Sequence, residues 1–188
     1  MQLILLGPPG TDTGRQAAIL SKHWQVPHIS VGNLLRIEVA KYTLLGVQAY
    51  TYMQVGDLVP DEIVLEVVSQ RLEQQDIKKS WVLDGFPRNL TQAYALQQWL
   101  NFARQSQPTV ICFEATVPSS RQTSLIKERL SSPLEADIFH RRWEVYQQET
   151  MPLISLYRQR RQLIFIDRAL TIQNLISTLE SISCQLTS

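Results

Sequence analysis

Residues 7–14 read Gly7-Pro8-Pro9-Gly10-Thr11-Asp12-Thr13-Gly14, and they separate a short apolar run, Gln2–Leu6, from a helical pattern. The glycines allow the backbone to curl so that successive N–H groups point inward. A helix that starts at about Gly14 presents the positive end of its dipole to the same place. The order of strand, glycine-rich loop and helix is therefore typical of a loop that holds phosphate groups. A tight connection after the first strand of a sheet is the alternative, and the loop alone leaves both open.

The loop departs from the full phosphate-binding pattern at one position. That pattern reads G-x-x-x-x-G-K-S/T, in which the lysine contacts the outer phosphates. The glycine spacing assigns the lysine to position 13, where this chain has Thr13.

Short apolar runs recur along the chain and indicate an α/β fold. Runs of this length, without alternation of polar residues, suit strands that are buried on both faces. Helical patterns separate them, which predicts a parallel sheet with helices on both sides. The five runs are Gln2–Leu6, Val26–Ile29, Trp81–Leu83, Thr109–Phe113 and Leu163–Ile166. A final helix carrying Leu175 and Leu179 is expected to pack on the sheet, and Ser131–Pro133 is expected to form a loop.

Composition limits the classes of function. The chain has 188 residues, 44% of them hydrophobic, and a formal net charge of +1. A single domain of this balance has no global field for nucleic acid or an anionic membrane. No apolar run is long enough for a signal peptide or a membrane span, so we expect a soluble, cytoplasmic protein. The basic run 158–161 is interpreted as a solvated helix end, and the two cysteines as buried apolar residues. The three histidines have no partner at ligand spacing and are assigned no chemistry.

Several further motifs, taken in order, identify a family resemblance. Met1–Gln16 resembles the start of the adenylate kinases. Ile29–Arg36, Gly56–Glu62 and the sequence Asp84-Gly85-Phe86-Pro87-Arg88 are similar to later motifs of the same family. The resemblance continues through Glu128-Arg129-Leu130, Arg142, Tyr146 and the stretch Thr150–Tyr157. It covers most of the chain.

The resemblance implies a fold and its subdivisions. The expected fold is a P-loop NTPase-like, three-layer α/β/α domain over residues 1–188, with a five-stranded parallel sheet. A small helical insertion at residues 30–59 would bind the nucleoside monophosphate. Residues 129–140 would form a truncated lid.

For the acceptor nucleotide, AMP, the resemblance implies a largely complete site. Arg36 and Arg88 would hold the AMP phosphate through charge-assisted hydrogen bonds, and Gln92 would reach the base. Val31 replaces a threonine of the family pattern, which leaves the choice of base open. The pocket would be completed by Ser30, Asp57, Val59 and Gly85.

For the donor nucleotide, ATP, the implied site is altered. Thr13 supplies no cation, Asp12 adds a negative charge where polyphosphate would lie, and Arg15 could return a positive charge to the loop. Gly10 and Gly14 keep the loop's backbone pattern. Arg129 would stack on the ATP base, Arg142 would act in the transition state, and Asp84 would contact Mg²⁺ through water. Ser131–Leu134 occupy the place of an expected lid arginine motif.

The family reaction is reversible phosphoryl transfer from Mg-ATP to AMP, which yields two ADP. With the donor lysine and lid arginines absent, we expect weak or no activity. One alternative is a non-catalytic protein that senses AMP. A second is a scaffold for a protein partner, for which Trp99 and Trp143 could supply surface. We expect a monomer.

Overall fold

Five strands form one parallel sheet in the computed structural model, which describes residues 1–113, 132–166, 174–177 and 179–181. The strand order is β2-β3-β1-β4-β5. The strands are β1 (Gln2–Leu6), β2 (His28–Ser30), β3 (Trp81–Asp84), β4 (Thr109–Phe113) and β5 (Leu163–Ile166). The predicted five-stranded parallel sheet is confirmed, and three of the five strands keep their predicted bounds.

The strand β2 begins two residues later than the apolar run suggested. The helix α1 (Thr13–Trp24) ends at Gln25, which has a φ of 52°, and the Val26 N–H donates to the Ser21 carbonyl. Val26 is therefore used in closing the helix. Pro27 has no N–H to donate, but its carbonyl accepts from Val82 N at 2.9 Å and so opens the ladder to β3.

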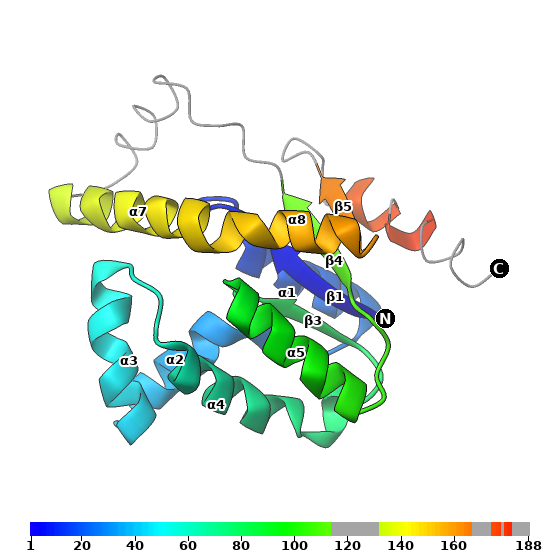
Figure 1. The fold of residues 1–188 in the computed structure, drawn as a ribbon, viewed down its shortest axis with the longest axis horizontal. Coiled ribbons are helices and arrows are strands. Elements are labelled where there is room, and N and C mark those ends of the chain that lie inside the picture. The colour runs from blue at the N-terminus through cyan, green and yellow to red at the C-terminus, as the bar shows by residue number, and fades with distance from the viewer. Residues whose placement is uncertain (114–131, 167–173, 178, 182–188) are drawn as a thin grey trace.

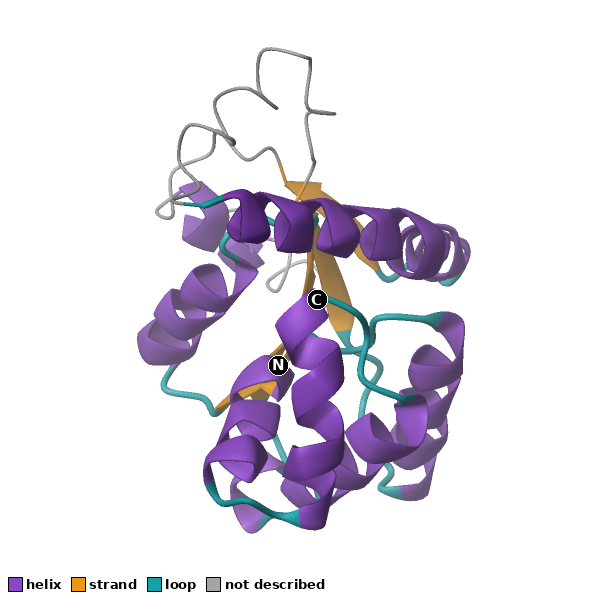
Figure 2. Ribbon diagram, turned by 90° about the vertical axis from the view of Figure 1, so that its left-hand side faces the viewer, coloured by secondary structure: helices purple, strands orange, loops and turns teal. Residues whose placement is uncertain are grey.

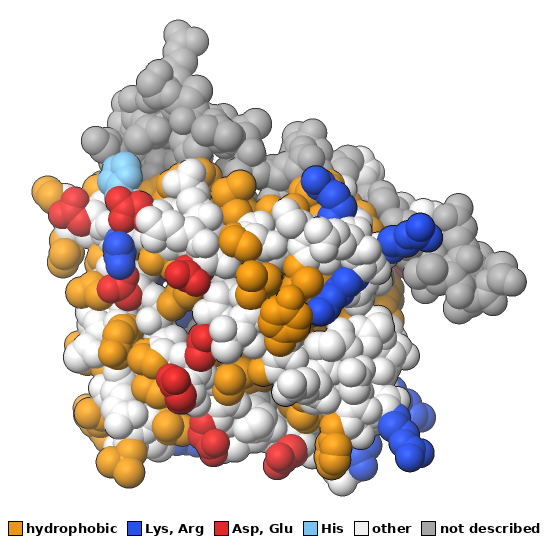
Figure 3. Space-filling model, in the orientation of Figure 1, with side chains coloured by type: hydrophobic (Ala, Val, Ile, Leu, Met, Phe, Trp, Pro, Cys, Tyr) orange, Lys and Arg blue, Asp and Glu red, His pale blue; other side chains and the backbone are white. Residues whose placement is uncertain are grey.

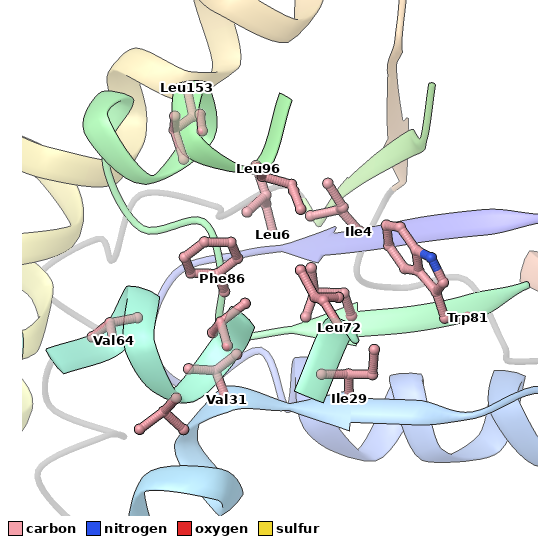
Figure 4. Packing of buried hydrophobic residues seen from close by; sticks show 14 of the residues in the cluster. Ile4, Leu6, Ile29, Val31, Val64, Leu72, Trp81, Phe86, Leu96 and Leu153 are labelled. Atoms are coloured by element: carbon pink, nitrogen blue, oxygen red, sulfur yellow. The ribbon is translucent and has the colours of Figure 1, made fainter. Parts of the chain in front are cut away.

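Helices cover both faces of the sheet (Figure 1 and Figure 2). On one face, Leu3 and Leu5 pack with Ala17 and Leu20 of α1 and with Leu175 and Leu179, so the predicted packing of the last helix is confirmed for these residues. On the other, Ile4 and Leu6 pack with the remaining helices (Figure 4). Those helices are α2 (Val31–Ala40), α3 (Leu44–Val55), α4 (Asp61–Leu72), α5 (Leu90–Phe102) and α8 (Met151–Gln159). A short 3-10 turn, Gln75–Ile77, joins α4 to the sheet.

A long helical rod crosses the molecule beside the sheet (Figure 1). It consists of α7 (Pro133–Val145), the π-helical turn η2 (Tyr146–Thr150) and α8. The Ser132 side chain accepts from Glu135 N at 3.3 Å, and Pro133 is the first helical residue. The loop predicted at Ser131–Pro133 is thus wrong for Pro133, because proline is well suited to the first turn of a helix. Residue 131 lies outside the described residues.

The helix α3 has no charged side chain on any face. Its outer side exposes Leu44, Val47, Tyr50 and Val55 to solvent. Hydrophobic side chains gather along the same edge of the molecule in Figure 3. Both α2 and α3 fall within residues 30–59.

Among the described residues, no helix combines the length and the apolar character that a bilayer span requires.

Candidate functional site

The glycine-rich loop lies where the strand order of the sheet reverses. β1 is central, and its neighbours β3 and β4 follow in the two opposite directions. Ligands of open parallel sheets bind outside the carboxyl ends of the strands at such a point. The loop is closed by Thr11, whose N–H and hydroxyl both donate to the Pro8 carbonyl, at 3.2 and 2.7 Å. Gly10 has a φ of 86°, which suits glycine.

The residues that depart from the phosphate-binding pattern have distinct positions in this loop. Asp12 is exposed, has a φ of 50° and precedes α1 without capping it through its side chain. The methyl group of Thr13 faces Gly7 at the start of the loop. If Gly7 carried a Cβ, that atom would lie 3.0 Å from the Thr13 methyl group. Arg15 is exposed on the first turn of α1. The loop residues 8–13, which include Thr13, contain no lysine or arginine.

Asp84 ends β3 beside the start of α1. Its Oδ1 lies 3.5 Å from the position that a Cβ on Gly14 would take. Its Oδ2 lies 2.5 Å from His28 Nε2, which belongs to the neighbouring strand β2. The sequence offers His28 no carboxylate or cysteine at ligand spacing, and the carboxylate that it contacts is far away along the chain. Fifty-six residues separate the two side chains, and only the pairing of β2 with β3 brings them together.

Arg88 is held at three points and leaves part of its guanidinium uncommitted. Its backbone N–H donates to Gln92 Oε1 at 2.7 Å, and its carbonyl accepts from the Thr150 hydroxyl at 2.8 Å. Its Nε donates to the Gly85 carbonyl at 3.1 Å. In the described part of the chain, no carboxylate lies within ion-pair distance of Arg88.

The charges around Arg88 include a second arginine. Burial lowers the pKa of the Arg88 guanidinium; Asp84 raises it and Arg142 of α7 lowers it further. The guanidinium remains positive at neutral pH. Tyr146 also lies nearby, and burial raises the pKa of its phenol well above the usual value. The structure thus places Arg88 near one carboxylate, Asp84, and one further cation, Arg142. An anion bound beside the two arginines would be stabilised by both.

The other predicted acceptor residues lie on several elements and differ in exposure. Arg36 is exposed on α2, and its Nη1 lies 3.5 Å from the position of a Cβ on Gly32. Gln92 is 1% exposed, and its Nε2 donates to Asp61 Oδ1 at 2.7 Å, so its amide is already paired. Asp57 pairs with Arg141 of α7. Ser30 precedes α2, while Val31 and Val59 belong to the buried core.

Some residues at this place were given no role by the sequence, although two of them lie in the matched stretches Gly56–Glu62 and Thr150–Tyr157. Asp61 and Thr150 make their contacts 31 and 62 residues away along the chain, with Gln92 and Arg88. Arg141 reaches Asp57 across 84 residues. The charge or the hydroxyl group of a residue does not indicate which distant residue it will contact. The topology of the fold determines the partner. The predicted donor residue Arg129 lies outside the described residues, as does Cys184. Cys112 is buried in β4, as expected.

The strand order and the glycine-rich loop at its switch point are those of the P-loop α/β class. The family model "Adenylate kinase" matches residues 5–162. The chain belongs to the adenylate kinase family. It is 41% identical to "Adenylate kinase 1" of Nostoc sp. over 166 residues, which cover 88% of this chain and 89% of the relative. It is 38% identical to the adenylate kinase of Trichodesmium erythraeum over 170 residues, 89% of each chain. With that of Xylella fastidiosa it shares 41% over 175 residues, 89% of this chain and 90% of the relative.

Proposed function

We propose that this protein binds AMP at an acceptor site built on Arg36 and Arg88, and that it transfers phosphoryl groups from ATP slowly. The observation that carries the proposal is the buried Arg88, whose Nε is held by the Gly85 carbonyl and whose guanidinium forms no ion pair among the described residues, with Arg142 close enough to act on it. A dianionic phosphate monoester between them would neutralise both charges. Bidentate hydrogen bonds from guanidinium groups suit its oxygens.

The proposed reaction needs little covalent chemistry from the protein. An oxygen of the AMP phosphate attacks the γ-phosphorus of ATP, and the bond to the β–γ bridging oxygen breaks. The products are two molecules of ADP. Such transfer is catalysed chiefly by positioning the nucleotides and by neutralising charge on the phosphates. Arg88 and Arg142 supply positive charge from the acceptor side.

The donor side supports only slow transfer. Thr13 stands where the phosphate-binding pattern has lysine, and Asp12 adds a carboxylate to the loop. Removing one preorganised charge-stabilising group from a transition state costs roughly a hundred- to a thousandfold in rate, about 2.7–4 kcal/mol. Arg15 starts from the exposed side of α1, so it does not replace a lysine that rises from inside the loop.

Magnesium fits the remaining carboxylate. Asp84 is 7% exposed and faces the first turn of α1, beside Gly14. A single carboxylate at this point would hold a Mg²⁺ ion through its water shell, with the nucleotide phosphates as direct ligands. The ion would supply charge neutralisation on those phosphates. His28 holds Asp84 in this orientation through its Nε2.

Binding measurements test the asymmetry between the two nucleotides. Isothermal titration calorimetry of the full chain with AMP, and separately with Mg-ATP, is expected to give tighter binding of AMP. Arg88→Gln removes the central cation and is expected to weaken AMP binding by about tenfold or more, since hydrogen bonds to charged groups contribute about 1.5–3 kcal/mol. Mg-ATP bound as tightly as AMP would contradict the proposal.

Turnover distinguishes slow catalysis from the loss of catalysis. A coupled assay of ADP formation from ATP and AMP, with Mg²⁺ present, is expected to give a low rate that Arg142→Gln abolishes. A rate indistinguishable from the buffer control, together with AMP binding, would favour a non-catalytic AMP-binding protein instead. The absence of binding to either nucleotide would favour the scaffold alternative.

A further inference from the structure

The position of Arg88 depends on Thr150, a residue to which the sequence motifs assign no role. Arg88 belongs to the loop that follows β3, and its backbone carbonyl accepts a hydrogen bond from the Thr150 hydroxyl at 2.8 Å. Thr150 is 3% exposed. A buried hydroxyl of this kind has a single well-defined partner, and a buried carbonyl left without one is costly.

Thr150 belongs to the same helical rod as Arg142. Eight residues separate the two, and between them lies the π-helical turn Tyr146–Thr150. In this turn the Met151 N–H donates to the Tyr146 carbonyl, five residues back. The wider turn inserts one residue relative to a regular helix, which changes the direction of the side chains that follow. Single π-turns of this kind often occur at functional sites.

The geometry also has an electrostatic consequence. Arg142 lowers the pKa of the Arg88 guanidinium, as one cation does to another nearby, while Asp84 raises that pKa by more. The bond from Thr150 to Arg88 joins the rod to the loop that carries Arg88 through neutral groups, and it holds both cations in place before a ligand arrives.

We propose that Thr150 is a positioning residue for the acceptor phosphate. Its hydroxyl ties the Arg88 backbone to the rod that carries Arg142, and so fixes the separation of the two cations that would clasp the phosphate. This inference rests on the proposed function, because it assigns the ligand between the arginines to the phosphate of AMP. The role assigned to Thr150 is exerted through Arg88, whose carbonyl its hydroxyl contacts.

The test compares AMP with adenosine, which lacks the phosphate. Thr150→Val keeps the shape of the side chain and removes the hydroxyl. We expect Thr150→Val to weaken AMP binding by about three- to tenfold, the range for one net hydrogen bond. Adenosine binding should change by less than about twofold. Thr150→Ser restores the hydroxyl and should return AMP binding to within about twofold of the unmodified chain.

Two controls separate positioning from general loss of structure. Ser21→Ala removes a comparable bond, from the Ser21 hydroxyl to the Val26 carbonyl at 2.5 Å, at the far end of α1. It is expected to leave the ratio of AMP to adenosine affinity unchanged. In an Arg88→Ala background, Thr150→Val should have no further effect on AMP binding, because the residue that it positions is absent. If Thr150→Val does not fold, Thr150→Cys offers a similar volume with only a weak donor.

Three results would overturn the assignment. One is AMP binding that Thr150→Val leaves unchanged. Another is an equal loss of AMP and adenosine binding, and the last is a full effect of Thr150→Val in the Arg88→Ala background. If the unmodified chain binds adenosine as tightly as AMP, the phosphate contributes no affinity, and the proposed acceptor site is refuted instead. The two failures are therefore distinguishable.

Discussion

Asp12 has a backbone conformation that suits glycine better and a charge that works against a bound polyphosphate. Its φ of 50° lies in the left-handed region, which Asp tolerates better than most residues but which glycine adopts without cost. Its carboxylate is exposed at the N-terminal end of α1, where the helix dipole favours a negative charge. The side chain thus brings to this end of the helix the kind of charge that a phosphate ligand would otherwise supply.

A double substitution tests this reading of the loop. Asp12→Gly with Thr13→Lys removes the carboxylate, relieves the backbone and adds the missing cation. We expect the rate of ADP formation to rise by about a hundredfold or more, because a cation would then face the transferring phosphate. The coupled assay measures the rate, and each single substitution serves as a control. An unchanged rate would point to residues 129–140 as the limiting segment.

Among the elements, α2 and α3 cross at a place where only glycine fits. A Cβ on Gly46 would lie 2.1 Å from the Glu38 carbonyl oxygen and 2.5 Å from Val39 N. Both are backbone atoms of α2 and cannot turn aside. Thr43 caps α3 by accepting from Gly46 N at 3.0 Å, and its hydroxyl is 2.7 Å from Glu38 Oε2. The close approach at Gly46 and the hydrogen bonds of Thr43 therefore determine how α3 is oriented on α2.

Replacing this glycine should destabilise the fold. Gly46→Ala gains up to about 1 kcal/mol of helix propensity, but the backbone clash forces the two helices apart. We expect a net loss of about 2 kcal/mol or more in the free energy of unfolding, measured by urea denaturation. Gly32→Ala is the matched control, because the nearest atom to its Cβ would be Arg36 Nη1 at an ordinary 3.5 Å. Equal stability of the two variants would contradict the tight crossing.

In the molecule as a whole, the rod is anchored by its last segment. Leu153 of α8 is fully buried and packs in the same cluster as Leu96 and Phe86 (Figure 4). At its other end, α7 lies against the end of α3, since a Cβ on Gly56 would lie 2.9 Å from the Ile138 carbonyl oxygen. Arg142 and Thr150 lie between these two contacts. The packing of α8 on the sheet thus positions the cationic part of the site.

Removing that anchor should affect the entire fold. Leu153→Ala deletes a completely buried side chain and is expected to lower the free energy of unfolding by about 2–5 kcal/mol. Leu134→Ala, at an α7 position that is 68% exposed, should change it by less than about 0.5 kcal/mol. Thermal and urea unfolding measure both. A small effect of Leu153→Ala would mean that the rod is held elsewhere.

The sequence by itself determined the sheet and the loop, because both depend on local patterns. Buried runs such as Thr109–Phe113 are apolar regardless of their partners. The glycine-rich loop is contiguous with the strand and the helix that it joins. The run Asp84–Arg88 is contiguous, so its resemblance to a known family was visible without any knowledge of the fold. The positions of β1, β4 and β5 followed without error.

Only the tertiary structure decided which distant side chains meet. The pairing of His28 with Asp84 follows from the order of β2 and β3 in the sheet. The contact of Thr150 with Arg88 depends on a π-turn, since a change of one residue in that turn would redirect the hydroxyl. Such contacts arise from crossovers and helix register, which no local pattern encodes. For this reason the glycine-rich loop could be predicted from residues 7–14, whereas the residues that hold Arg88 in place could not.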